Sequence, residues 1–317
     1  MIVYKYAVSV CDVRNKGNLE NYRQKRAEWL SFLVGDEPHS ISSQISTLSW
    51  DFCLFKTINE LRRISVEQPT KSVGFNPYVS QMFDAGFFAT QSLAIRRLTD
   101  APNARAGRNV ISLKRLISEI RTLRNIMTRE VYVCNDGLPY DHALAEQTWF
   151  EQWHQSGTFN QRQYLPVQGA KAWQSSAELH EKFDFLSGVQ ATARSRDDLI
   201  LPERLDDIET KLSACKDIRK LVDKFIAHAA DLPSREELSE GETYTTLNKL
   251  HEAHKSIFQV AVFINNNILG AASFATNVPI PQDDHLVNLD KKWVQTAKLD
   301  FAHKIWDAEV ALWEQAE

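Results

Sequence analysis

Apolar residues recur at intervals of three and four positions along most of the chain, the spacing that gathers them on one face of an α-helix. Glycine, which disfavours helices, occurs 11 times in 317 residues. The pattern predicts an all-α fold, with helices over about 19–34, 41–58, 77–98, 113–127, 205–229, 244–269 and 289–313. The run over 205–229 predicts one continuous amphipathic helix.

Particular residues predict where helices begin and end. Asn76 precedes Pro77, and an Asn side chain can accept hydrogen bonds from the free amides of a helix start, where proline loses nothing by lacking an N–H. Ser112 or Asn109 can cap the next helix in the same way. Residues 134–141, with an Asp-Gly pair and a proline, predict its end.

Residues from about 142 to 200 are rich in Gln, Trp and Ser, and their pattern is less regular. They predict shorter helices joined by loops, which we interpret as an insertion into a helical bundle. The last helix is expected to pack back on that bundle. The whole chain, 1–317, is therefore expected to form a single helical domain.

Charge and cysteine content favour a cytoplasmic protein. The formal net charge is −4 at pH 7, so a nucleic-acid site would have to be a local basic patch. The four cysteines are scattered and form no Cys-x-x-Cys pair, which indicates reduced thiols. No membrane segment is expected, because the apolar stretch 257–275 is interrupted by three consecutive asparagines, which are costly in hydrocarbon.

Familiar catalytic motifs are absent. The sequence contains no glycine-rich phosphate loop, nucleophile elbow or Cys/His nucleophile pattern, which argues against nucleotide hydrolases, α/β-hydrolases and thiol proteases. His251 and His254 are three positions apart, whereas helical zinc motifs place two histidines four apart and add a third ligand. We interpret both as solvent-facing, and expect neither a metal nor a cofactor.

Lys114, Arg121 and Arg124 share one polar face of their predicted helix. Such a face can follow a phosphate backbone. A solvated face opposite the apolar stripe explains the same residues. Both interpretations remain open at this stage.

Four segments are informative together: 91–100 (QSLAIRRLTD), 111–117 (ISLKRLI), 132–141 (YVCNDGLPYD) and 221–228 (LVDKFIAH). They resemble the HEPN superfamily (higher eukaryote and prokaryote nucleotide-binding domains), especially its abortive-infection, AbiU-like branch. The resemblance extends over about 38–270, and it implies a HEPN-like helical bundle with a core at about 38–133 and 201–270, an insertion at about 134–200 and an additional C-terminal helix at about 289–314.

The resemblance implies a site and a chemistry. Many HEPN proteins are homodimers and metal-independent ribonucleases with an Arg, four to six intervening residues and a His, which here is His228. An imidazole can move the proton of a ribose 2′-OH, and a guanidinium can hold the phosphate as its charge grows. Asp223 and Lys224 are the other candidate catalytic residues, and Arg219 and Arg97 are candidate phosphate ligands.

The sequence departs from this pattern at the arginine. Val222 stands six positions before His228, where the branch would place Arg, and it cannot bind a phosphate. Arg219 is nine positions before His228, so on an α-helix it points away from the histidine. Lys224 is one turn from His228 and shares its face, so it can supply a point charge without the bidentate geometry of Arg.

Two functions follow as alternatives. The first is a prokaryotic defence or toxin–antitoxin type protein that binds or cleaves RNA, with His228 at the site. The second is a non-catalytic HEPN-like binding or scaffold protein that lost the catalytic arginine. His228 itself can equally be a structural residue near a helix C-terminus, where a cationic imidazole is favourable.

Overall fold

The computed structural model describes residues 4–35, 38–66, 76–102, 110–155, 164–227, 230–271, 274, 279–289, 291 and 299–314. Over these residues the fold is all-α, as predicted: no strand is present, and an isolated antiparallel bridge joins Thr128 and Leu199. The chain forms two compact units, Met1–Val278 and Pro279–Glu317. The division into one domain with an insertion stays a prediction.

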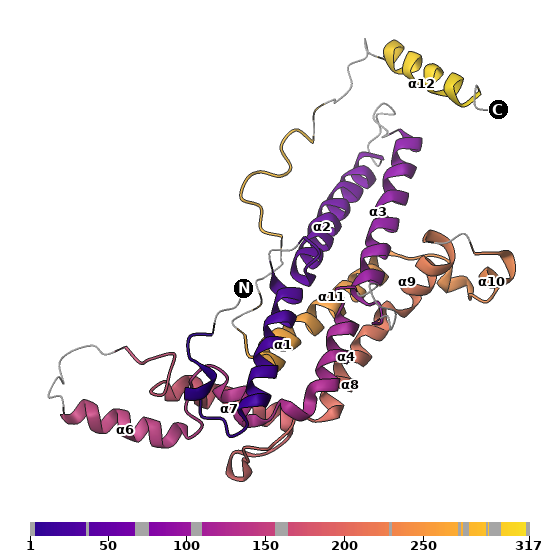
Figure 1. Cartoon of the computed structure of the whole chain (residues 1–317). Coiled ribbons are helices and arrows are strands. Elements are labelled where there is room, and N and C mark those ends of the chain that lie inside the picture. The colour runs from indigo at the N-terminus through magenta and orange to yellow at the C-terminus, as the bar shows by residue number, and fades with distance from the viewer. Residues whose placement is uncertain are drawn as a thin grey trace. The chain divides into compact units, whose positions relative to one another are not determined.

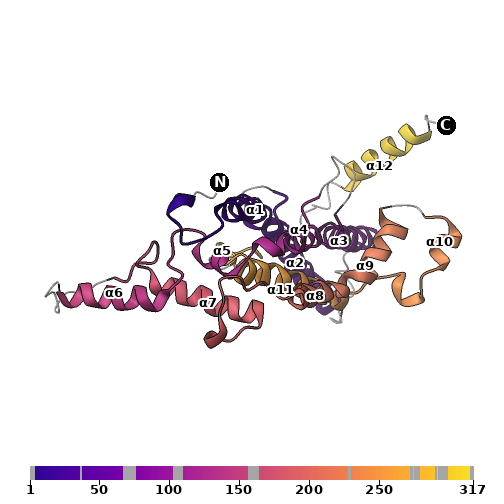
Figure 2. The ribbon, with the colours of Figure 1, turned by 60° about the horizontal axis from the view of Figure 1, so that its bottom comes forward.

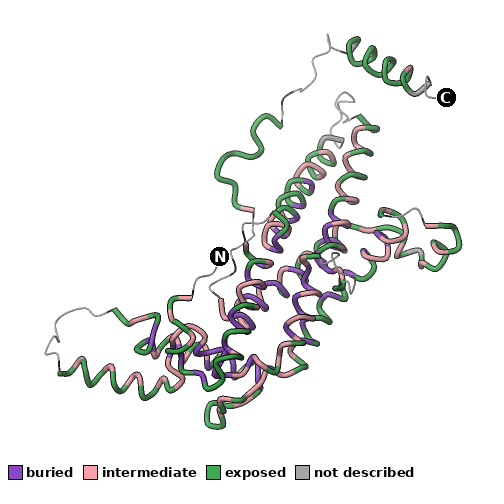
Figure 3. The backbone as a smooth tube through the Cα atoms, viewed as in Figure 1, coloured by how far each residue is buried: buried purple, intermediate pink, exposed green. Residues whose placement is uncertain are grey.

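Four helices build the first part of the larger unit: α1 (Lys16–Val34), α2 (Ile41–Val66), α3 (Pro77–Leu98) and α4 (Leu113–Leu123). Helices α2 and α3 run side by side (Figure 1). Their buried residues lie between Ile41 and Phe55 of α2 and in the second half of α3 (Figure 3). The buried apolar residues from Ile41 to Phe52 and from Ala94 to Leu98 join the hydrophobic core that α1 and α4 share.

The predicted caps are confirmed. The Asn76 side chain accepts hydrogen bonds from the amides of Tyr78 and Val79, at 3.0 and 3.2 Å. The Ser112 hydroxyl accepts one from the Arg115 amide at 3.1 Å and so begins α4, whereas Asn109 lies outside the described residues. Because a cap satisfies amides that have no partner within the helix, each defines a helix start.

The prediction of one continuous helix over 205–229 is wrong. The segment consists of α8 (Pro202–Lys211), a 3₁₀ turn (Leu212–Cys215), α9 (Lys216–Leu221) and a π-helical turn (Val222–Ile226). The buried side chains nevertheless keep the predicted spacing; they include Leu205, Ile208, Leu212, Cys215, Ile218 and Val222. A short helix, α10 (Leu232–Glu236), begins beyond it, with Pro233 in its first turn.

Helix α11 (Leu247–Phe263) lies at the centre of the larger unit. It contacts α2, α3 and α8, and Figure 2 shows it beside α8. It continues as a π-helical turn, Ile264–Ile268, at the end of the helix that the sequence predicted over about 244–269. Leu250, Ile257 and Val260 are buried in the common core. No helix among the described residues is long and apolar enough to cross a lipid bilayer.

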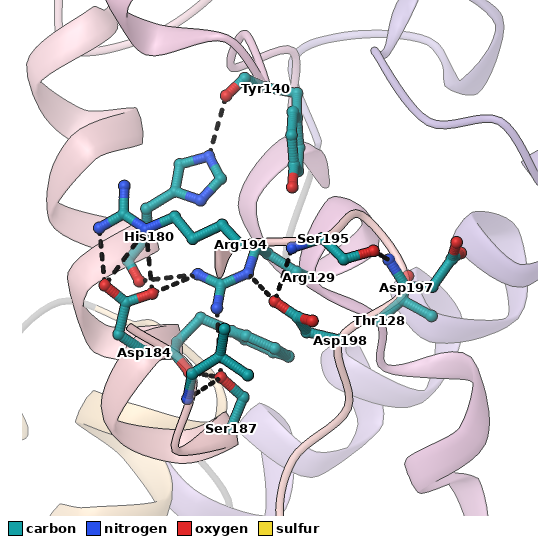
Figure 4. A network of polar contacts seen from close by, with 12 residues as sticks. Thr128, Arg129, Tyr140, His180, Asp184, Ser187, Arg194, Ser195, Asp197 and Asp198 are labelled. Carbon is teal, nitrogen blue, oxygen red and sulfur yellow. Dashed lines mark hydrogen bonds and ion pairs between the residues drawn. The ribbon is translucent and has the colours of Figure 1, made fainter. Parts of the chain in front are cut away.

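In the described residues of the region 134–200, two regular helices, α6 (His142–Gln155) and α7 (Trp173–Ser187), pack together. A charged network attaches α7 to α5 (Arg129–Cys134) (Figure 4). The Arg129 side chain is 0% exposed and pairs with Asp184 of α7 at 2.6 Å and with Asp198 at 2.8 Å. Arg194 pairs with the other oxygen of Asp184 at 2.7 Å.

The smaller unit contains α12 (Leu299–Glu314). The predicted start near 289 is wrong, because the described residues there form turns around Asn288, whose φ is 67°. The apolar side chains of α12 are exposed within this unit; they include Phe301, Ile305, Trp306 and Leu312. The expected packing of this helix on the bundle stays a prediction.

Candidate functional site

The two segments that carry the strongest family resemblance lie against each other. Arg96, in the last turn of α3, donates from its Nε to Oδ1 of Asp223 in the π-helical turn, at 2.6 Å. Its Nη1 lies 3.3 Å from Oδ2 of Asp100. We call α9 with its π-helical turn, Lys216–Leu221 and Val222–Ile226, the motif helix. The end of α3 and the motif helix thus form one polar cluster.

Local capping brings α4 to the same cluster. Helix α3 ends at Leu98, and the Thr99 hydroxyl donates back to the Ile95 carbonyl at 2.8 Å. The cap residue of α4, Ser112, donates its hydroxyl hydrogen to the Asp100 carbonyl at 2.7 Å. The chain therefore returns to the end of α3 immediately before Lys114, whose charge acts on the Asp100 carboxyl.

The cluster has more cations than anions. The Arg219 guanidinium lies 4.0 Å from the Asp100 carboxylate, so Arg96 and Arg219 balance Asp100 and Asp223. Arg97 is exposed and Lys114 half-buried, and within the described part of the chain neither has an ion-pair partner. These two residues give the junction of α3, α4 and the motif helix a net positive charge.

Burial shapes the ionisation of this cluster. Burial raises the pKa of Asp100, and the nearby Arg96 and Arg219 guanidinium groups oppose that effect. The hydrogen bond to Asp223 raises the pKa of Arg96, which keeps this guanidinium charged. The Arg219 Nε is buried and has no hydrogen-bond partner among the described residues. The junction therefore has donor capacity that the protein does not use.

Val222, the position at which the family pattern would have Arg, faces the hydrophobic core. It is 0% exposed and continues the buried stripe of Cys215 and Ile218. The π-helical turn begins at this residue, where the Ala227 amide donates to the Val222 carbonyl at 2.8 Å. Turns of this kind are frequent at functional sites. In this chain, position 222 is turned away from the charged cluster.

Two lysines of the motif helix pair with carboxylates from the segment that follows this helix. The Lys224 ammonium lies 3.2 Å from Glu237, and the Lys220 ammonium lies 2.5 Å from Glu242. The bond to Lys220 is the main reason that the pKa of Glu242 is lowered to about 2. Lys220 and Lys224 of the motif helix are therefore both paired with acidic side chains.

The remaining candidate residues lie elsewhere or outside the described part. His228 lies outside the described residues, so its proximity to Lys224 stays a prediction. Arg121 pairs with Asp206 at 2.7 Å and with Glu209 at 2.9 Å, which ties α4 to α8. Arg124 donates to a backbone carbonyl, and it lies ten positions beyond Lys114, or about 15 Å of helix. The structure does not bring these two arginines to the cluster.

The prediction for the histidine pair is correct for His251 and wrong for His254. His251 is exposed, but the His254 ring packs edge-on against Phe52, with centroids 5.3 Å apart. Burial lowers the pKa of His254 to about 4, which keeps it neutral at physiological pH. Across the described residues, no group of three or more His, Cys, Asp and Glu side chains is arranged to hold a metal ion.

Arg96 is the site residue that sequence reasoning missed. It stands in the resemblance segment 91–100, four positions before Asp100, a spacing that permits an ion pair within one helix. Its contact with Asp223 joins residues that are 127 positions apart, and no local pattern predicts such a contact.

A comparison with models of protein families matches residues 43–288 to the HEPN AbiU2 model, described as AbiU2. Comparisons with curated proteins and with solved structures give no match. The matched range contains both segments of the polar cluster and covers more than half of the 317 residues. The protein therefore belongs to the HEPN AbiU2 family, of the abortive-infection defence type, as the motif segments indicated.

Proposed function

We propose that this protein acts in defence by binding RNA at the junction of α3, α4 and the motif helix, and by cleaving it without a metal ion. The observation that carries the proposal is the contact of Arg96 with Asp223, which joins the two family segments beside a surplus of positive charge. A local basic patch is what an RNA backbone requires of a chain whose net charge is negative.

The proposed chemistry uses groups of this chain. The His228 imidazole takes the proton from a ribose 2′-OH as the oxygen attacks the adjacent phosphorus. The bond from phosphorus to the 5′-oxygen of the next nucleotide then breaks, which leaves a 2′,3′-cyclic phosphate. That oxygen takes a proton from water, and the protonated His228 returns its proton to the solvent. Cations at the junction stabilise the negative charge that grows on the phosphate oxygens. No oxidant, reductant or cofactor is needed.

In the second proposed function, the protein binds RNA but does not cleave it. The observation that favours it is the burial of Val222, because the family's arginine position is here part of the core. A HEPN-like protein of this kind would bind RNA as a scaffold. Both functions are proposed for the cytosol, and both would be compatible with a homodimer.

The experiment compares the wild type with His228→Ala. Structured RNA and tRNA are incubated with each protein in EDTA, and cleavage products and RNA affinity are measured. His251→Ala is a matched control, because His251 is an exposed histidine on α11. Cleavage that His228→Ala loses and His251→Ala keeps supports the ribonuclease.

The other outcomes are equally decisive. Tight RNA binding with equal, background-level products from all three proteins supports the scaffold and excludes the ribonuclease. Absence of RNA binding by the wild type contradicts both functions.

A further inference from the structure

We propose that Arg96 of α3 is the phosphate-binding arginine of this protein and replaces the family's arginine at position 222. The inference rests on the proposed RNA-binding function and names the residue that supplies its central charge. It assigns to a neighbouring helix a role that the family pattern places on the motif helix itself.

Position 222 is unsuited to binding a phosphate because of its burial, and not only because its side chain is apolar. Val222 is fully buried between core residues of the same helix, so no side chain at that position reaches the charged surface without disturbing the core. The next residue, Asp223, faces the cluster and is 43% exposed at its side chain. The polar side chain nearest to position 222 is therefore that of Asp223, and the guanidinium bound to it is that of Arg96 from α3.

Arg96 is held in a defined orientation with donors to spare. Its Nε is used by Asp223 at 2.6 Å, and its Nη1 by Asp100 at 3.3 Å. A guanidinium has five N–H donors, so the Nη2 group and one hydrogen on Nη1 remain available. The side chain is 31% exposed, which allows these donors to meet a phosphate oxygen.

Charges around Arg96 favour an anion there. Asp100 and Asp223 orient the guanidinium, while Arg219 offsets one of these carboxylates. Lys114 adds a positive charge that acts on Asp100, and the exposed Arg97 follows Arg96 directly in the chain. An RNA phosphate at Arg96 would thus enter a positive field and not merely meet one ion pair.

The test separates binding from structure by changing each half of one ion pair. Arg96→Gln and Asp223→Asn both remove the Arg96–Asp223 ion pair, but only the first removes the guanidinium. Arg96→Lys keeps the charge and loses the planar, bidentate donor geometry. Arg62→Gln is the control, because it breaks a comparable bond to Asp84, nearer the other end of α3, with oxygen contacts at 2.7 and 2.9 Å.

Affinity for fluorescently labelled tRNA is measured in EDTA over a series of salt concentrations, with a thermal melt of every variant. We expect Arg96→Gln to weaken binding about tenfold or more, and Arg96→Lys to weaken it less. The slope of log affinity against log salt should fall by about one, which marks a lost phosphate contact. Asp223→Asn should bind tRNA as tightly as the wild type or more tightly.

A purely structural role gives a different result. Equal losses of affinity in Arg96→Gln and Asp223→Asn, or an Arg96→Gln variant that binds like Arg62→Gln, would overturn the inference and leave the proposed function intact. If Arg96→Gln does not fold, Arg96→Lys and Asp223→Asn decide between the two roles. A wild type that binds no tRNA contradicts the proposed function, and the assignment of Arg96 with it.

Discussion

The ammonium of Lys224 on the motif helix lies 3.2 Å from the Glu237 carboxylate, in the segment that follows this helix. Glu242 of the same segment pairs with Lys220. A carboxylate is a weak substitute for a phosphate, since both accept hydrogen bonds from an ammonium group. In the proposed RNA complex, Glu237 would therefore compete with the RNA backbone for Lys224.

Glu237→Gln is expected to increase RNA affinity about threefold, because it removes this competitor and one negative charge near the site. Glu236→Gln makes the same change of charge at a neighbouring exposed residue that forms no bond with Lys224. Anisotropy titrations with labelled tRNA at low salt measure both. Equal gains would indicate a general charge effect, and a weaker Glu237→Gln variant would contradict the prediction.

The Arg129 network predicts a large loss of stability when one side is removed. Arg129→Met leaves the largely buried Asp198 without its guanidinium partner and Asp184 with Arg194 alone, and breaking a buried ion pair in this way typically costs about 3–5 kcal/mol. Arg121→Met breaks two ion pairs on an exposed surface and should cost less than about 1 kcal/mol. Urea unfolding followed by circular dichroism compares them, and similar midpoints for the two variants would contradict the structural role of Arg129.

The lowered pKa of His180, which lies beside this network, predicts that the stability of the protein depends on pH. Its Nε2 donates to the Tyr140 carbonyl at 2.9 Å, and burial lowers its pKa to about 4 (Figure 4). Between this value and the ordinary value of 6.5, the unfolded chain binds a proton that the folded chain does not. This histidine's contribution to stability is therefore complete above pH 6.5 and falls towards pH 4, by at most about 3 kcal/mol.

His180→Gln keeps a side-chain donor for Tyr140 but cannot be protonated in this range. The variant should lose less stability than the wild type when the pH falls from 7.5 to 5. Melting temperatures at these two pH values test this. Parallel losses in the two proteins would show that His180 is protonated as readily in the folded chain as in the unfolded one.

The local signals in the sequence were sufficient for the helix starts at Asn76 and Ser112, because a cap depends on a few adjacent residues. For the irregular turns within 205–229, no adjacent residues in the sequence give a comparable indication. The 3₁₀ turn at Leu212–Cys215 tightens the helix, and the π-helical turn at Val222–Ile226 widens it. The two changes oppose each other, so the buried side chains keep the spacing of a continuous α-helix.

The same limit applies to the candidate site. The sequence identified Asp223 and the segment containing Arg96, and the resemblance related them to one family. Their contact depends on how α3 packs against the motif helix, which no local pattern encodes. The burial of His254 against Phe52 was missed for the same reason, because the covering ring comes from α2.

Val222→Arg tests whether the family's arginine can simply be restored. Because Val222 is fully buried, an arginine there would place an unpaired charge in the core, and we expect a loss of about 3 kcal/mol or more and no gain in RNA cleavage. Phe225→Arg, in the same π-helical turn, changes a side chain at an exposed position and should stay folded. Melting temperatures and tRNA cleavage in EDTA are measured for both. A Val222→Arg variant that melts like the wild type and cleaves faster would show that position 222 reaches the phosphate after all, and Arg96 would then have only an orienting role.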